Sequence, residues 1–224
     1  MTDTKPTIAV LGGTGKEGPG LALRWAAAGY KIIIGSRQAE KAEATAAELN
    51  AKLGINTIIG LDNETAARSA DISVLTVVAT AHQPALEGLV EALQGKILVD
   101  ATARVDFRDP KPPVAPAAAQ TAQEILGRGV KVVAAFQNVP AHALKKLGEP
   151  IASDVLICSD DVDAAQQVIQ LAQDGGMQAY YAGGLVNALV VEGLTSLLIS
   201  LNKHYGVKTA SIGITGVGES VTGD

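Results

Sequence analysis

The stretch VLGGTGKEGPGLALRW, residues 10–25, joins an apolar run to a helical pattern through several closely spaced glycines. Gly13, Gly15 and Gly18 match the pattern G-x-G-x-x-G, which is weak by itself because glycine is common. Here the pattern follows a predicted strand and opens a predicted helix, as a dinucleotide-binding turn does. In such a turn the glycines permit a tight turn, close approach of a pyrophosphate, and close packing of helix on strand. The stretch therefore predicts a cofactor turn, with a purely structural turn as the alternative.

The remaining residues of this turn are compatible with phosphate binding. A helix N-terminus presents free N–H groups and a partial positive charge to phosphates. Pro19 fits the first helical turn, where its missing N–H removes no hydrogen bond. Thr14 adds a hydroxyl donor. The expected cofactor-contacting residues of the turn are Gly13, Thr14, Gly15, Lys16, Glu17 and Gly18.

Outward from the turn, short β-branched runs alternate with alanine-rich helical stretches. Several of the runs are apolar throughout, which is typical of strands covered by helices on both faces. Such alternation with short connections implies right-handed crossovers. The fold class is therefore α/β, a Rossmann-type, doubly wound and mostly parallel sheet with a small C-terminal helical part. Strands are predicted at 7–12, 31–36, 56–61, 71–78, 96–101, 131–136, 154–159 and 177–183, and helices at 17–28, 38–53, 63–69, 82–94, 117–128 and 161–174.

The strands stop after Tyr181, which divides the chain into a dinucleotide-binding domain, 1–182, and a C-terminal part, 183–224. The C-terminal part contains GLVNALVVEGLTSLLISL, residues 184–201, the most apolar long stretch. It carries Asn187 and Glu192, whose burial in lipid would be costly, and it is short for a membrane span. We expect a helix buried in protein. A second subunit should cover part of it, since one small domain cannot bury it all.

The residues after the second predicted strand indicate which dinucleotide is bound. An NAD site usually has an acidic residue about 20 positions after the glycines, at the end of that strand. Here Ser36 and Arg37 occupy this place, and Lys41 lies at the start of the next helix. A hydroxyl and two cations suit the 2′-phosphate of NADP(H). Glu40 falls inside the helix start, where it would interact with the helix dipole. NADP(H) is the predicted cofactor, with a solvated helix face as the alternative for Arg37 and Lys41.

Few side chains could carry a proton in a nicotinamide enzyme, which usually employs His, Lys or Tyr for this purpose. The candidates are His82, His142, His204 and Asp100, and the simplest interpretation of each histidine is an exposed or capping residue. No spacing of His, Asp or Glu suggests a metal site. We therefore predict no catalytic side chain and no metal, which suits a direct hydride exchange in which the protein positions two rings.

The bulk composition argues against a nucleic-acid-binding protein and favours a cytoplasmic one. The net charge is −5 and the basic residues are dispersed, which argues against a nucleic-acid surface. The lone cysteine, Cys158, cannot build a disulfide framework, and a reduced, cytoplasmic setting is expected. The N-terminus lacks the pattern of a signal peptide.

The segment IAVLGGTGKEGPGLALRWAAAGYKIIIGSRQAEKAEATAAEL resembles the start of the NADPH-dependent coenzyme F420 reductases, the F420H2:NADP+ oxidoreductases. The resemblance continues through DISVLTVV, KVVAAFQNVPA, DVLICSDD and AGGLVNALVVEGLTSLLISLNKHYG, and it spans residues 7–206. It implies a Rossmann domain with a small helical C-terminal part, commonly a homodimer. It also implies hydride transfer between C5 of the deazaflavin and C4 of the nicotinamide, with F420 as co-substrate and without a metal or a covalent intermediate.

The resemblance also implies roles for particular residues. The pyrophosphate would lie on Thr14, Gly15 and Lys16, and the 2′-phosphate on Ser36, Arg37 and Lys41. The segment 138–141 would position the nicotinamide through Asn138, Pro140 and the Ala141 backbone, and Val77 would contact the cofactor. The deazaflavin would stack over the nicotinamide, between the loops after the fourth and sixth strands and the long C-terminal helix.

Three departures from the family pattern fall on the deazaflavin side. Gln137 stands where members commonly have His, Leu189 where an Arg is common, and VATAHQP, residues 78–84, lacks a Pro-Trp pair. Two alternatives therefore stay open: an NADPH-dependent reductase of a flavin or a flavin-relayed metal ion, and a non-catalytic NADP-sensing module. The tail SIGITGVGESVTGD, residues 211–224, resembles the opening of the ligases that add glutamate to F420. It is expected to be either a linker to a fused domain or an ordinary frayed terminus.

Overall fold

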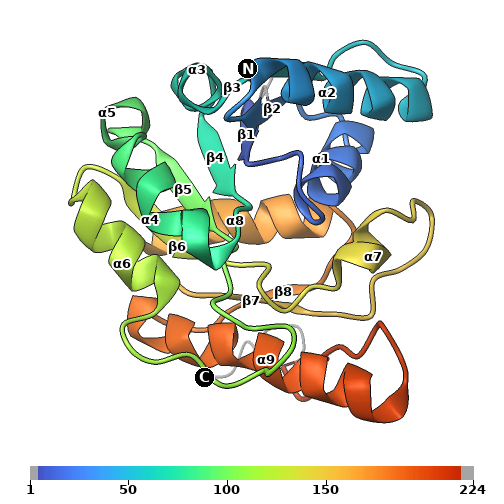
Figure 1. Cartoon of the computed structure of the whole chain (residues 1–224), viewed down its shortest axis with the longest axis vertical. Helices are drawn as coiled ribbons and strands as arrows, with labels where there is room; N and C mark the ends of the chain where they lie inside the picture. Colours follow the sequence, from blue (N-terminus) through green and yellow to red (C-terminus); the bar gives the residue numbers. More distant parts are fainter. Residues whose placement is uncertain (1–4, 218–224) are drawn as a thin grey trace, which may run out of the picture.

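The computed structural model describes residues 5–217 and shows a parallel sheet between two layers of helices (Figure 1). The six strands of this sheet lie in the order β3-β2-β1-β4-β5-β6, and all neighbouring pairs are parallel. The chain therefore winds in one direction from β1 to β3 and in the other from β4 to β6. The carboxyl ends of β1 and β4 meet where the direction reverses, which is where ligands bind in such sheets.

The elements follow one another as strand and helix through most of the chain. Their bounds are β1 Ile8–Leu11, α1 Gly18–Ala27, β2 Ile32–Ser36, α2 Ala39–Leu53, β3 Ile59–Asp62, α3 Asn63–Ser69, β4 Ile72–Leu75, α4 Ala79–Glu87, α5 Val90–Leu93, β5 Ile97–Asp100, α6 Ala118–Leu126, β6 Lys131–Ala134, α7 Ala141–Leu144, β7 Val155–Ile157, α8 Val162–Asp174, β8 Ala179–Tyr181, the 3-10 turn η1 Leu185–Asn187 and α9 Ala188–Tyr205.

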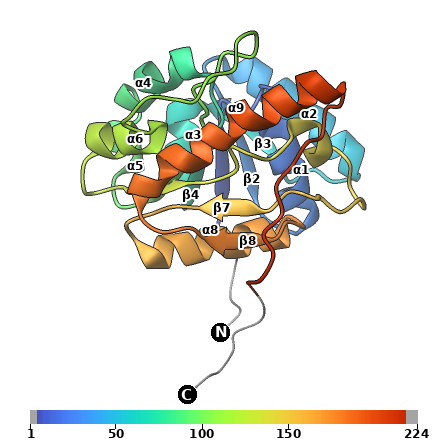
Figure 2. The same cartoon turned by 90° about the horizontal axis from the view of Figure 1, so that it is seen from below.

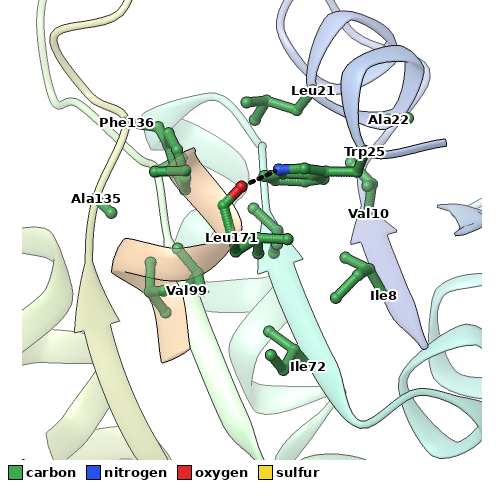
Figure 3. Close-up of a cluster of buried hydrophobic side chains, with 14 of the residues drawn as sticks. Ile8, Val10, Leu21, Ala22, Trp25, Ile72, Val99, Ala135, Phe136 and Leu171 are labelled. Atoms are coloured by element: carbon green, nitrogen blue, oxygen red, sulfur yellow. Dashed lines mark hydrogen bonds between the residues drawn. The ribbon is translucent and has the colours of Figure 1, made fainter. Parts of the chain in front are cut away.

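Two hydrophobic clusters lie on the two faces of the sheet. One joins Ile8 and Val10 of β1 to helices α1, α2 and α8, and the other joins Ala9 and Leu11 to helices α3 to α6 and the start of α9. Alternate residues of one strand thus point to opposite layers. In the first cluster Trp25 packs edge to face on Phe136, with 5.7 Å between ring centroids, and its indole N–H donates to the Leu171 carbonyl (Figure 3). The predicted doubly wound fold is confirmed.

Several local predictions were wrong in their extent. The fourth strand ends at Leu75 because its pairing with β1 ends there: the Thr76 N–H makes the last hydrogen bond of that ladder, to the Leu11 carbonyl, and the Thr76 hydroxyl donates to the same oxygen. The single helix predicted at 82–94 is two helices, α4 and α5, separated at Gly88 and Leu89. The predicted strands at 154–159 and 177–183 pair as β7 and β8 in a separate parallel sheet. A two-bond antiparallel bridge between Ala134 and Cys158 joins that sheet to the end of β6.

The C-terminal part is a long helix followed by a segment that runs back over the domain (Figure 2). The helical stretch Leu185–Tyr205 is long and apolar enough to cross a membrane by length and composition. One face of it nevertheless carries Glu192, which is bound by the domain. The segment after α9, residues 207–214, is fixed at Asp154, whose N–H donates to the Ile212 carbonyl at 2.8 Å and whose carboxylate accepts from the Ile214 N–H at 2.6 Å. We refer to residues 207–214 as the return segment. The predicted linker lies in part outside the described residues, at 218–224.

Candidate functional site

The glycine turn after β1 is shaped by contacts that leave no room for side chains. Gly12 has φ +67°, and a Cβ on Gly13 would lie 2.5 Å from the Val10 carbonyl oxygen. A Cβ on Gly18 would lie 2.7 Å from the Cα of Gly13, so the helix packs closely on the turn. Gly15 is different: it is exposed, and a Cβ there would meet nothing closer than 3.5 Å. Packing of the protein does not require glycine at this position, whereas close approach of a phosphate group would. The turn fits a pyrophosphate.

The other turn residues fall into two groups. Thr14 is partly exposed and Lys16 exposed, so both can meet a ligand. Glu17, also expected as a cofactor contact, stands at the start of α1 with one carboxyl oxygen, Oε1, buried and without a hydrogen-bond partner in residues 5–217. Burial raises the pKa of Glu17 to about 8. The residue as a whole keeps some exposure, so the buried oxygen rather than the entire side chain accounts for this shift.

The expected 2′-phosphate residues lie beside this turn, because β2 is the direct neighbour of β1. Ser36 ends β2 and is buried, with its hydroxyl accepting from the Gln38 N–H at 3.3 Å. Arg37 and Lys41 are exposed, and neither forms an ion pair with any residue of the described part of the chain. Two cations without carboxylate partners at this edge suit an anionic ligand.

Val77 and the segment after β6 lie beyond the carboxyl ends of β4 and β6. Val77 lies against the glycine turn: a Cβ on Gly12 would be 2.6 Å from its Cγ1. The segment after β6 leads through Phe136, with an unusual φ of +74°, to Ala141, the first residue of α7. Asn138 is buried, and its amide nitrogen donates to the Asp154 carbonyl at 2.8 Å. Its Oδ1 has no partner in residues 5–217. Asn138 thus holds the segment carrying Pro140 and Ala141 against residues 153–154.

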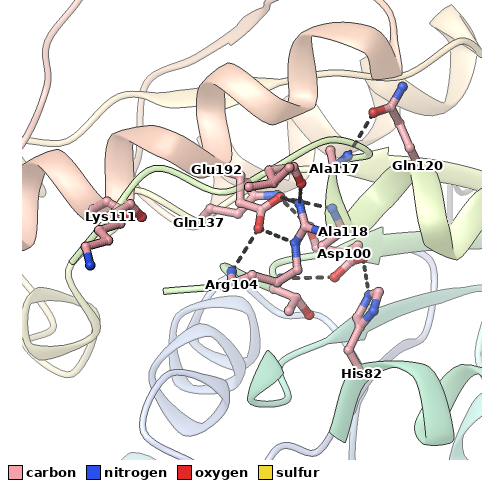
Figure 4. A network of polar contacts seen from close by, with 12 residues as sticks. His82, Asp100, Arg104, Lys111, Ala117, Ala118, Gln120, Gln137 and Glu192 are labelled. Carbon is pink, nitrogen blue, oxygen red and sulfur yellow. Dashed lines mark hydrogen bonds and ion pairs between the residues drawn. The ribbon is translucent and has the colours of Figure 1, made fainter. Parts of the chain in front are cut away.

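The structure brings together two residues that were separate candidates in the sequence. His82 of α4 and Asp100 of β5 are both buried, and His82 Nε2 lies 2.7 Å from Asp100 Oδ2 (Figure 4). The expectation that every histidine is exposed or caps a helix was therefore wrong for His82. The Asp100 main-chain carbonyl also accepts from Gln137 Nε2 at 2.9 Å, and the Gln137 carbonyl accepts from the Thr195 hydroxyl of α9. This network ties α4, the end of β5 and the segment after β6 to α9.

A second polar cluster fixes α9 to the domain. Glu192 Oε1 accepts from the Arg104 main-chain N–H and Nε at 2.9 and 2.7 Å, and Oε2 from Arg104 Nη2 and the Ala118 N–H at 3.0 and 2.9 Å (Figure 4). All four bonds are charge-assisted, and the carboxylate is buried. The Ala118 N–H is also at the start of α6, where a helix favours a negative charge. The partners of Glu192 were not predicted from the sequence.

A cavity of about 290 Å³ opens beside Pro140. The expected deazaflavin position was between the loops after the fourth and sixth strands and the long helix. The walls of this cavity instead combine the end of the loop after β6 with α7, the segment that follows α7, and the return segment. Its lining residues are Pro140, His142, Ala143, Lys146, Glu149, Pro150, Ile151, Ala152, Ser153, Thr209 and Ser211. The space is large enough for part of a second substrate next to the expected nicotinamide position.

Comparison with known proteins assigns the family. Residues 7–104 match the family model described as NADP oxidoreductase coenzyme F420-dependent. The chain is 40% identical to the F420-dependent NADP reductase of Methanothermobacter thermautotrophicus, over 95% of this chain and 96% of that protein. The chain belongs to the F420-dependent NADP reductase family.

The same comparisons support the fold and reveal a more distant relative. A crystal structure from Arthrobacter sp. FB24, of a protein assigned as an F420-dependent NADP reductase, superposes with a TM-score of 0.78 at 25% identity, covering 94% of this chain and 100% of that one. Human metalloreductase STEAP2 is 27% identical over 88% of this chain, which corresponds to 37% of the human protein.

Proposed function

We propose that this protein transfers a hydride directly between NADP(H) and coenzyme F420, without a metal. The supporting observation is similarity over nearly the whole chain to a protein named F420-dependent NADP reductase. The glycine turn of this chain also lies beside Arg37 and Lys41, which form no ion pair within residues 5–217. The pyrophosphate is proposed to lie on Thr14, Gly15 and Lys16. The 2′-phosphate then reaches Ser36, Arg37 and Lys41, one strand away. The pyrophosphate positions follow the carboxyl end of β1, beside the reversal of strand order, and the 2′-phosphate positions lie at the carboxyl end of β2.

The nicotinamide is proposed to lie between Val77 and Ala141, the first residue of α7. Asn138 and Pro140 would position it through the backbone, since Asn138 fastens this segment to residues 153–154. The second substrate would enter the cavity beside Pro140. In this arrangement the protein supplies binding and orientation, which can account for much of the rate of a hydride transfer.

The direct test mixes purified protein with reduced F420 and NADP+ and follows the absorbance of the deazaflavin. We expect formation of oxidised F420 and NADPH in equal amounts. No turnover at any pH between 5 and 9, in either direction, would contradict the proposal. Binding of NADPH without turnover of any acceptor would instead support an NADP-sensing role.

A flavin or a flavin-relayed metal ion is the second candidate for the acceptor. The similarity to human STEAP2, named a metalloreductase, favours it, as does glutamine at position 137 next to the proposed nicotinamide position. Reduction of FMN by NADPH, with no reaction of F420 under the same conditions, would favour this candidate over the first.

The protein is also proposed to be a homodimer that works in the cytoplasm and binds neither nucleic acid nor membrane. Val186, Val190, Leu197, Leu201 and Tyr205 are exposed along α9 and its preceding turn, at spacings that place them on one side of the helix. A second copy of this helix would cover them. Its opposite side is committed to the domain through Glu192, which disfavours transfer of the helix into lipid.

A further inference from the structure

Arg24 of α1 is a buried charged residue that the proposed function leaves unexplained. It is 6% exposed and forms no ion pair with any residue between 5 and 217. Buried charges are normally paired, because removing an ion from water is costly. Burial accordingly lowers the pKa of Arg24.

Main-chain carbonyls take the place of a carboxylate partner. Nε donates to the Leu144 carbonyl at 3.0 Å and Nη1 to the Gly175 carbonyl at 3.1 Å. Nη2 donates to the Lys146 carbonyl at 2.7 Å, with longer contacts of 3.3 Å to the Ala143 and Glu149 carbonyls. Several of these carbonyls end α7 or follow α8, where helix dipoles place partial negative charge. The guanidinium therefore binds the C-terminal ends of two helices.

Four of the five acceptors lie between residues 143 and 149, directly after Ala141. Ala143, Lys146 and Glu149 of this stretch also line the cavity beside Pro140. Arg24 itself belongs to the helix that begins in the glycine turn. Arg24 thus connects α1, which begins at the proposed pyrophosphate site, to residues 141–149, which carry the proposed nicotinamide position and line part of the cavity beside Pro140.

A second contact on the same face of α1 supports this connection. A Cβ on Gly20 would lie 2.6 Å from the Leu144 Cβ, so α1 and α7 touch almost backbone to backbone. Arg24 lies four residues later, one turn along the helix, and binds the carbonyl of the same Leu144. Gly20 sets how closely α7 approaches α1, and Arg24 sets where α7 lies along it.

We propose that Arg24 is a positioning residue, which fixes the separation between the pyrophosphate turn and the nicotinamide end of the NADP(H) site. This inference rests on the proposed NADP(H) site. It matters for rate because a ring misplaced by about 1 Å can slow a transfer by about 100-fold.

The test compares NADPH with 2′-phospho-ADP-ribose, which lacks the nicotinamide ring. Binding of both is measured by calorimetry to the wild-type protein and to the Arg24→Lys and Arg24→Met variants, together with kcat for F420. Neither variant should change the dissociation constant of the fragment more than about twofold, because the fragment needs only the turn and the loop after β2. In Arg24→Met, kcat should fall by about 10- to 100-fold, and the affinity advantage of NADPH over the fragment should shrink or disappear. Arg24→Lys, which keeps the charge but fewer bonds, should lie between.

Lys96→Met is the matched control for stability. Lys96 Nζ also caps a helix end, donating to the carbonyls of Ala67, Arg68 and Ala70, but on the opposite face of the sheet from α1. This variant should lose stability without changing kcat or either affinity. If Arg24→Met does not fold, Arg24→Lys decides the outcome.

Equal weakening of fragment binding and NADPH binding in the Arg24 variants would overturn the inference. A folded variant with an unchanged kcat and an unchanged ratio of the two affinities would overturn it as well. The ratio of NADPH affinity to fragment affinity is measured without a second substrate. It therefore tests the role of Arg24 even if F420 is not the acceptor. If the wild-type protein binds neither NADPH nor the fragment, the proposed function fails and the inference fails with it.

Discussion

Replacing Glu192 by alanine should destabilise the fold far more than an average substitution does. The carboxylate is 2% exposed and accepts four hydrogen bonds, from Arg104 and the Ala118 N–H. Removing one partner of a buried ion pair costs about 3–5 kcal/mol. Because the Arg104 side chain is 30% exposed and can turn to water, we expect the lower part of this range, about 3–4 kcal/mol. For a chain of this size that corresponds to a fall in Tm of about 6–16 °C.

The assay is urea and thermal unfolding followed by circular dichroism. Glu192→Gln serves as the graded variant, because it keeps one acceptor oxygen but places an NH2 group against N–H donors. It should lose less than the alanine variant. Asp109→Asn is the matched control, since it removes an exposed ion pair to Lys111 at 2.6 Å, and exposed ion pairs contribute little to stability. A loss of unfolding free energy below about 1 kcal/mol for Glu192→Ala would refute the reasoning, because the bonds from Arg104 and Ala118 to Glu192 would then contribute no more than a surface ion pair.

Three further predictions follow from the site and the surface. Arg37→Ala should weaken NADPH binding by about 10- to 100-fold and leave NADH binding nearly unchanged, because only the 2′-phosphate can use that charge-assisted bond; equal weakening of both in fluorescence titrations would contradict the assignment. Glu17 has its pKa raised from 4.5 to about 8, so the folded protein holds a proton that the unfolded chain has lost, and stability should fall as pH rises through this window. Glu17→Gln should flatten that slope in urea unfolding at pH 5 and pH 9, and parallel profiles would argue against it. Leu197→Lys should convert a dimer to a monomer in light-scattering chromatography, and a monomeric wild-type protein would exclude the proposed dimer.

The features predicted correctly from the sequence are those that depend on short, contiguous sequence patterns. The strand–helix alternation gave the sheet, and the glycine pattern gave the sharp turn whose crowding appears at Gly13 and Gly18. Ser36 and Arg37 were placed at the end of β2 because a strand end is a local property.

The features that were missed depend on contacts between distant segments. The residues around His82 do not predict its contact with Asp100. Asp100 is 18 residues away in the sequence, and the two are adjacent only because β4 and β5 pair. The acceptors of Arg24 are main-chain carbonyls, which carry no sequence signature. The four-residue helix α7 is too short to show a period, and its position depends on α1. For Glu192, a buried charge in an apolar helix was the available signal, but its partner could be found only in three dimensions.

Trp25 gives the molecule an optical property of its own. It is the single tryptophan of the chain, fully buried, with its indole bonded to α8 and its ring in contact with Phe136. Phe136 immediately precedes Gln137 and Asn138, so any shift of that segment alters the environment of one indole. The emission of the unlabelled protein therefore reports on a single, known location, and stopped-flow fluorescence can time each binding step without a probe being added.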